Sequence, residues 1–447
     1  MATTRNFPTC GALARAALAV AIGAVLVFGA ASPHGPSRPS WTAGLDADEL
    51  DLIGFAGRMP DSEKPKLTAY FLRESYPRGG SARLVITDTA TDVSVQFFRA
   101  GGEREETIPN DVMLGSAAST PQPIGDVTGR RELSLRLGNW PSGMYYARLT
   151  AGDRTGYAPF ILRPHFLGEH RIALVLPTES WQAYNFRDDD RDGRPNTWYA
   201  GGNTARLIRP FTNRGVPPHW RQYDAPFVRW LVQTGRNVDY LSDQDLRTAG
   251  SGARLAAAYS LLIFSGHHEY VTKHEYDVVT GFRNRGGDLM FLSANNFFWK
   301  ITIRDDVMTK VAQWRHLGRP EAALVGVGYR GNDRGKHRGP WIVRDIHSAP
   351  WLFAGMHLGL GGSFGSAGIE IDKTTPSSPR QLRILAEVPN LLGPGLSGQM
   401  TYYETPAGAR VFAAGAFTLA GAVWSDDIEP LMANLWRHMA PDEPATA

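Results

Sequence analysis

Two histidines and a glutamate, His267, His268 and Glu269, occupy one short segment that follows an apolar run ending at Phe264. Imidazole and carboxylate groups are side chains that bind metal ions and transfer protons in enzymes. A zincin helix is excluded, because its second histidine must follow the first by four residues, whereas His274 follows His268 by six. The segment therefore indicates a functional polar site, and the alternative is an ordinary solvated loop.

A second polar segment begins like a calcium-binding loop, with carboxylates at Asp188, Asp190 and Asp192 and a glycine at Gly193. The twelfth position of the loop is Tyr199, where such loops carry a glutamate. A Ca²⁺ site and a polar turn both stay open, and the pattern favours the turn.

The elements that must position these residues alternate between strand and helix after residue 165. Apolar runs at 171–176, 238–241, 261–264 and 288–292 predict strands, and segments 227–232 and 273–285 predict helices. Alternation of this kind indicates an α/β domain with a parallel sheet over residues 166–440. Ligands bind beyond the C-terminal ends of such strands, which selects the segments that begin at Pro177, Ser242, Ser265 and Ser293.

Residues 45–165 have a different pattern of short alternating segments separated by turns. They include 67–72, 82–87, 93–98, 132–137 and 144–149. Strands at this spacing predict an immunoglobulin-like β-sandwich that precedes the α/β domain.

The N-terminus predicts export. Arg5 and Arg15 precede an uncharged apolar run, 16–31, that ends in small residues, as in a signal peptide over 1–31. An uncleaved membrane anchor is the alternative, and residues 32–44 read as a linker. We expect a secreted or cell-envelope location, with membrane association only if the segment is uncleaved.

The cysteine content and the net charge argue against several kinds of site and partner. The only cysteine, Cys10, lies in the predicted signal peptide. Its removal would exclude disulfides, thiolate metal sites and a cysteine nucleophile. The net charge of +3 comes from interspersed basic and acidic residues, which disfavours a nucleic-acid partner.

Several segments in order resemble the large (beta) subunit of N,N-dimethylformamidase and proteins that share its C-terminal domain. They are 178–185 (TESWQAYN), 227–231 (FVRWL), 266–270 (GHHEY), 293–299 (SANNFFW), 324–329 (LVGVGY) and 403–406 (YETP). The resemblance covers about 165–440. It implies a glutamine-amidotransferase-like (flavodoxin-like) α/β fold and an amidohydrolase whose iron is bound by two tyrosines and one glutamate.

Transferred to this chain, the resemblance makes Glu269 the carboxylate ligand of a ferric ion and Tyr184 one phenolate ligand. Tyr199 is the second phenolate, with Tyr223 as the alternative. His267, Asn295 and Glu404 correspond to the catalytic histidine, amide and acid-base carboxylate.

The chain departs from the family at three places. His268 replaces a proline, Asn296 replaces a glycine, and Arg315 lies near the region of the family's active-site lysine.

Two functions follow. The first is an exported iron-dependent hydrolase of a small-molecule amide, with a homo-oligomer or a small subunit as partner. The second is an exported carbohydrate- or peptide-binding or scaffold protein with a vestigial site.

Overall fold

The computed structural model describes residues 61–104 and 109–440. All of them belong to one compact unit, which spans Leu45–Ala447. The predicted signal peptide and linker lie outside the described residues. Among the helices described, none is both long enough and apolar enough to cross a membrane.

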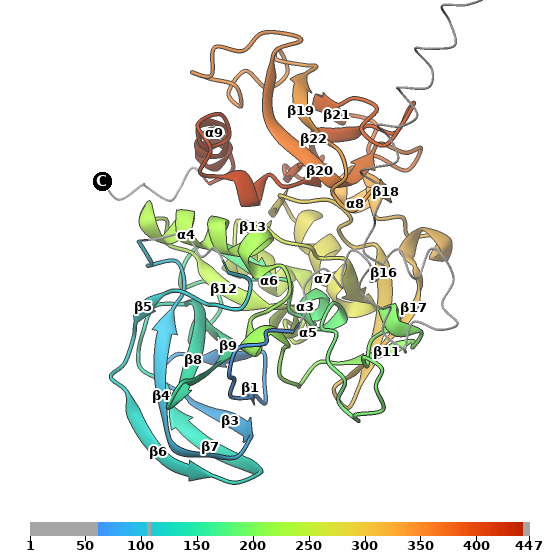
Figure 1. The fold of residues 1–447 in the computed structure, drawn as a ribbon. Coiled ribbons are helices and arrows are strands. Elements are labelled where there is room, and N and C mark those ends of the chain that lie inside the picture. The colour runs from blue at the N-terminus through green and yellow to red at the C-terminus, as the bar shows by residue number, and fades with distance from the viewer. Residues whose placement is uncertain (1–60, 105–108, 441–447) are drawn as a thin grey trace, which may run out of the picture. The chain divides into compact units, whose positions relative to one another are not determined.

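The described part of residues 61–163 contains strands in two sheets (Figure 1). The first sheet has the order β1 (Ala69–Phe71), β3 (Ser81–Thr87), β7 (Arg130–Arg136). The second has the order β2 (Ser75–Pro77), β9 (Arg154–Arg163), β8 (Gly143–Ala151), β4 (Ala90–Arg99), β5 (Ser116–Ala117), with β6 (Gln122–Val127) also paired to β4.

Both of these sheets contribute to one apolar core, in which Leu84 and Ile86 of β3 pack in the same cluster as Phe97 of β4 and Leu149 of β8. The alternation of apolar and polar residues in the sequence therefore predicted the strands correctly. The immunoglobulin-like type of the sandwich stays a prediction.

The second half is built on five parallel strands. Their order is β12 (Asp239–Ser242), β10 (Ile172–Leu176), β13 (Leu261–Phe264), β15 (Asp288–Phe291), β23 (Arg410–Ala413), and each adjacent pair is parallel. The four strands that the apolar runs predicted are therefore confirmed.

β10 and β13 are apolar throughout because alternate residues enter two different cores. Leu174 and Ile263 pack in one core with α4 (Ala225–Gln233) and α9 (Glu429–Met439). Val175 and Leu262 pack in the other core with α5 (Asp243–Arg247), α6 (Gly252–Ala258) and α7 (Lys273–Arg283).

The strand order creates a switch point at β10. From β10 the chain passes to β12 on one side, and β13 then pairs on the other side of β10. In open parallel sheets, ligands bind at the C-terminal strand ends beside such a reversal. The segments that follow β10 and β13 are therefore the expected location of a site.

Beyond β23 the sheet continues in antiparallel strands, which the sequence patterns did not predict. They are β22 (Gly398–Glu404), β21 (Arg383–Val388), β19 (Arg338–Val343), β20 (Ser363–Lys373) and β18 (Gly328–Asn332), and β24 (Ala416–Phe417) also pairs with β20. A smaller sheet has the order β11 (Thr204–Arg206), β17 (Val307–Gln313), β16 (Trp299–Arg304), β14 (Tyr270–Thr272). A short helix, α8 (Ala322–Val325), lies between β17 and β18 in the chain.

Gly415 connects β23 to β24, and the backbone conformation at this position requires a glycine. Its φ is 68°, and a Cβ there would lie 2.0 Å from the carbonyl oxygen of Gln399. We expect Gly415→Ala to lower the free energy of unfolding by about 3 kcal/mol, because left-handed strain and steric overlap add. Urea denaturation measures this loss.

Gly408→Ala is the matched control. Gly408 also has a positive φ, 84°, but nothing lies within 4 Å of its added Cβ. We expect a loss of about 1 kcal/mol. Equal losses in the two variants would contradict the steric explanation.

Candidate metal and acid-base site

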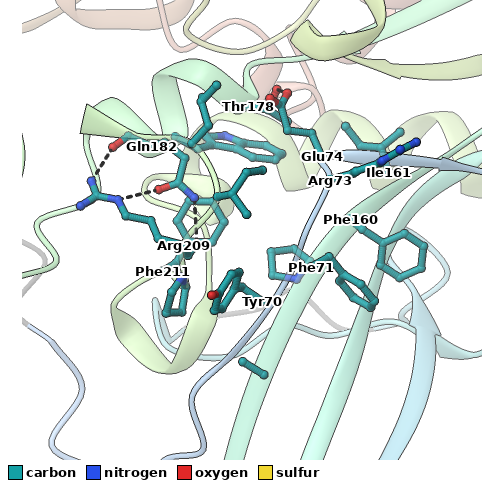
Figure 2. A pocket seen from close by; sticks show the side chains of 16 residues that line it. Tyr70, Phe71, Arg73, Glu74, Phe160, Ile161, Thr178, Gln182, Arg209 and Phe211 are labelled. Atoms are coloured by element: carbon teal, nitrogen blue, oxygen red, sulfur yellow. Dashed lines mark hydrogen bonds between the residues drawn. The ribbon is translucent and has the colours of Figure 1, made fainter. Parts of the chain in front are cut away.

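The segment after β10 forms the short helix α3 (Thr178–Ala183), and Tyr184 ends it. Arg209 is buried and donates to the carbonyl oxygens of Gln182, at 3.1 Å, and Asn185, at 2.9 Å. Because the last carbonyls of a helix lack partners within it, this guanidinium fixes the C-terminal end of α3. Figure 2 shows Arg209 bonded to Gln182 at one side of a cavity between β1, β9 and α3. Arg209 thereby fixes the backbone on both sides of Tyr184.

Hydrogen bonds also fix the backbone of the segment after β13. The backbone N–H of Glu269 donates to Ser180 Oγ of α3, 3.2 Å away, and Ser293 Oγ donates to the carbonyl oxygen of Gly266. A Cβ on Gly266 would lie 2.1 Å from Asp224 Oδ1. The loop therefore brings Glu269 against α3, as the strand-end rule predicts.

Tyr184 and Glu269 meet directly, because the Tyr184 hydroxyl donates to Glu269 Oε2 over 2.6 Å. Tyr199 lies in a one-turn helix, η2 (Trp198–Ala200). Its ring stacks on Tyr184 with centroids 4.7 Å apart, and its hydroxyl is 3.4 Å from Glu269 Oε2. The structure therefore brings all three predicted metal ligands together.

The alternative second tyrosine, Tyr223, belongs to η4 (Trp220–Asp224) and packs on Phe417 at 4.6 Å between ring centroids. Tyr270 is closer to the ligands than Tyr223, because its hydroxyl contacts that of Tyr199. Sequence reasoning assigned no role to Tyr270.

His267 lies between two carboxylates. Its Nε2 is 3.5 Å from Glu269 Oε2 and 3.4 Å from Glu370 Oε2. Glu370 comes from β20 and is only 3% exposed. Sequence reasoning missed this residue, although a glutamate and an aspartate alternating with isoleucines in Ile369-Glu370-Ile371-Asp372 are an unusual pattern for a strand.

His268, at the position where the resemblance implies a proline, packs on β13. Its ring meets Phe264 edge-on at 4.9 Å, and its Nδ1 is 3.3 Å from the carbonyl oxygen of Gly266. The histidine at position 268 therefore changes the packing of the loop and does not disturb the contact between His267 and Glu269.

Asn295 joins the cluster through an unusual backbone. Its φ is 57°, and its N–H donates to both oxygens of Asp372, at 3.0 and 2.9 Å. Hydrogen bonds from the Asn295 side chain act on the pKa values of Glu269 and Glu370. Asp372, two residues beyond Glu370 on β20, is thus the group that positions Asn295.

Glu404 is the one predicted catalytic residue that the structure separates from the cluster. It ends β22, where it pairs with Arg410 at the start of β23. Arg410 in turn bonds Asp288 at the start of β15. Parallel strands start at the edge opposite the site, so Glu404 lies away from the cluster, and its acid-base role stays a prediction. The carboxylate beside His267 is that of Glu370.

Burial controls the electrostatics of the cluster. It raises the pKa of Glu269 to about 7 and that of Glu370 well above its ordinary value, and it lowers the pKa of His267 to about 3. The charge of Lys310 opposes the rise at Glu269; its amino group lies 4.8 Å from the centre of the Trp299 ring. Lys310 is therefore the cation that acts on Glu269, whereas the charge of Arg315 acts on Asp372.

The donor set fits a hard metal ion. Glu269 offers a carboxylate, and Tyr184 and Tyr199 offer phenol oxygens. Three buried polar atoms around them, His267 Nε2, Asn295 Oδ1 and Glu370 Oε2, make no hydrogen bond, although the first and the last lie 3.4 Å apart. Buried carboxylates and unpaired polar atoms are costly unless a charge or a ligand compensates them.

Asp188, Asp190 and Asp192 place one carboxylate oxygen each within 4.8 Å of the others. The Asp188 carboxylate already accepts hydrogen bonds from the backbone N–H groups of Arg191 and Gly193, as in a polar turn. The calcium site stays a prediction.

Comparison with known proteins agrees with the resemblance of the motifs. The family described as "N,N-dimethylformamidase beta subunit-like, C-terminal" matches residues 130–427. The N,N-dimethylformamidase beta subunit of Alcaligenes sp is 22% identical over 329 residues, 60% of this chain and 43% of the relative. That of Paracoccus aminophilus is 22% identical over 406 residues, 68% of this chain and 53% of the relative. The chain thus spans about half the length of these relatives.

Removal of Asp372 tests its role in the site. Asp372→Ala leaves the buried N–H of Asn295 without an acceptor, so we expect the free energy of unfolding to fall by about 1–3 kcal/mol. Urea denaturation gives the value. Asp345→Ala is the control, because Asp345 also accepts two backbone N–H groups, from His347 and Ser348, but at the surface. A larger loss in the control would contradict the assignment.

Proposed function

We propose that this chain, which belongs to the N,N-dimethylformamidase beta subunit-like, C-terminal family, is an iron-dependent hydrolase of amide C–N bonds. The family supports an amide hydrolase. The observation that carries the finer proposal is the convergence of Tyr184, Tyr199 and Glu269 with His267 and Glu370 in one buried cluster.

Tyr184, Tyr199 and Glu269 would hold the ion, since two phenolates and one carboxylate suit a hard trivalent cation. A bound ferric ion supplies Lewis acidity, which polarises the carbonyl group of an amide. The protein's own groups supply the rest of the chemistry, because each lies within reach of the ligands.

Asn295 would donate its side-chain N–H to the oxygen that gains negative charge when water attacks the carbonyl carbon. His267, with Nε2 between the two carboxylates, would accept the proton of the attacking water. Glu370 would deliver a proton to the nitrogen as the C–N bond breaks, which releases a neutral amine. Its raised pKa keeps a proton available on this carboxyl group.

Fold, location and partners complete the proposal. The strand order β12-β10-β13-β15-β23 supports a glutamine-amidotransferase-like domain, here preceded by an immunoglobulin-like sandwich. The apolar segment 16–31 supports export. The relatives are named beta subunits, and we propose that this chain also assembles, with copies of itself or with a smaller subunit.

The first test is the metal. We expect the purified protein to contain about one iron per chain and to absorb visible light through phenolate-to-iron charge transfer. Glu269→Ala should lose both the iron and the band, as measured by elemental analysis and a visible spectrum. Glu404→Ala, the control carboxylate at the opposite edge of the sheet, should keep both.

Two results would reject this function. Colourless, iron-free protein with full hydrolytic activity is one, and Glu269→Ala with bound iron and turnover is the other. A metal-free chain that binds glycans and keeps that binding in Glu269→Ala would favour the binding-protein hypothesis instead.

The second test compares the two candidate acid-base carboxylates. We expect Glu370→Gln to reduce amine release from N,N-dimethylformamide and larger N-acyl amides by about 100-fold or more, because proton transfer to the leaving nitrogen is lost. Glu404→Gln should retain activity within about threefold. The opposite ranking would restore Glu404 and reject Glu370.

A further inference from the structure

We propose that Tyr270 is a positioning residue of this site, whose hydroxyl donates a hydrogen bond to the Tyr199 oxygen and holds that oxygen as a metal ligand. The inference rests on the proposed function, because it concerns the same phenol oxygens. It assigns a third tyrosine to a site for which the resemblance implies two.

The backbone places Tyr270 where it can do this. Tyr270 is the first residue of β14, directly after Glu269, and it pairs with Trp299 of β16. The side chain is 1% exposed, and its ring packs on Trp198 with centroids 4.8 Å apart. A rigid strand and a buried indole therefore leave the phenol little freedom to turn away.

Hydrogen-bond chemistry sets the direction of the bonds. The Trp198 indole N–H is 3.3 Å from the Tyr270 oxygen, and an indole N–H can only donate. The Tyr270 oxygen is therefore the acceptor in that contact. Its single proton remains for another acceptor. The hydroxyl contacts the oxygen of Tyr199, and Glu269, whose pKa a hydrogen bond from Tyr270 lowers, is the second acceptor within reach.

Tyr199 depends on such a donor more than Tyr184 does. Tyr184 makes a 2.6 Å hydrogen bond to Glu269 Oε2, whereas the Tyr199 hydroxyl is 3.4 Å from the same atom. A phenolate has no proton and can only accept. When Tyr199 is a ligand, Tyr270 is thus the neighbouring group that can satisfy its second lone pair.

The rival role for Tyr270 is that of a ligand in place of Tyr199. The two roles differ in what the loss of one oxygen does. Loss of a hydrogen-bond donor changes the energy of the Tyr199 phenolate and leaves the iron bound. Loss of a ligand instead removes the iron, or removes the absorption of one of the two phenolates.

The experiment compares iron content and visible spectrum of the full-length wild type, Tyr270→Phe and Tyr199→Phe, each reconstituted with Fe³⁺. We expect Tyr270→Phe to keep the iron stoichiometry and to shift the band to longer wavelength, because a phenolate without its hydrogen bond releases an electron more easily. Tyr199→Phe should lose band intensity and iron affinity. An unshifted band in Tyr270→Phe, or loss of its iron, overturns the inference.

Two further variants complete the design. Tyr259→Phe is the matched control, because this buried tyrosine also donates its hydroxyl proton to a neighbouring oxygen, that of Asp239 at the start of β12. The band of this variant should not move. Trp198→Phe leaves the phenol in place and removes its donor, so a smaller shift in the same direction is expected, and no shift counts against the inference. Absence of a band in the wild type would instead reject the proposed function, and the inference with it.

Discussion

The burial of the Glu269 carboxylate is the constraint on which the rest of this site depends. A carboxylate with 4% exposure is unfavourable unless hydrogen bonds or an opposite charge compensate it. The surrounding groups meet this requirement from separate parts of the chain: Tyr184 and Tyr199 from the segments after β10, and Asn295 from the segment after β15. A metal cation at this place would complete the compensation.

The supports of the cluster explain why these groups can meet. Arg209 holds the end of α3, and Ser180 holds the backbone of Glu269. Asp372 holds Asn295, and its own backbone N–H donates to the carbonyl oxygen of Gly415. Each support is a hydrogen bond between segments distant in sequence, so a change outside the cluster is expected to alter its geometry.

The antiparallel extension of the sheet gives the site its second carboxylate. β20 carries Glu370 and Asp372 on neighbouring inward positions, and β24, which pairs with it, carries Phe417 against the ring of His267, with centroids 5.1 Å apart. The segments that follow the parallel strands would place Tyr184 and Glu269 together without Glu370. The family match from residue 130 to 427 includes both parts.

The amino-acid sequence alone determined the parallel strands and the position of the site at the ends of β10 and β13, because apolar runs and strand-end rules are local properties. The resemblance of its motifs also selected Tyr184, Tyr199, His267, Glu269 and Asn295, which the structure places in one cluster. Only the tertiary structure decided that Glu370 lies beside His267 and that Glu404 lies away from it. The reason is register: whether a residue on an antiparallel strand lies at one edge of the sheet or the other depends on pairing with distant strands, which no local pattern records. The contact of Tyr270 with Tyr199 and the left-handed backbone of Asn295 have the same origin in long-range packing.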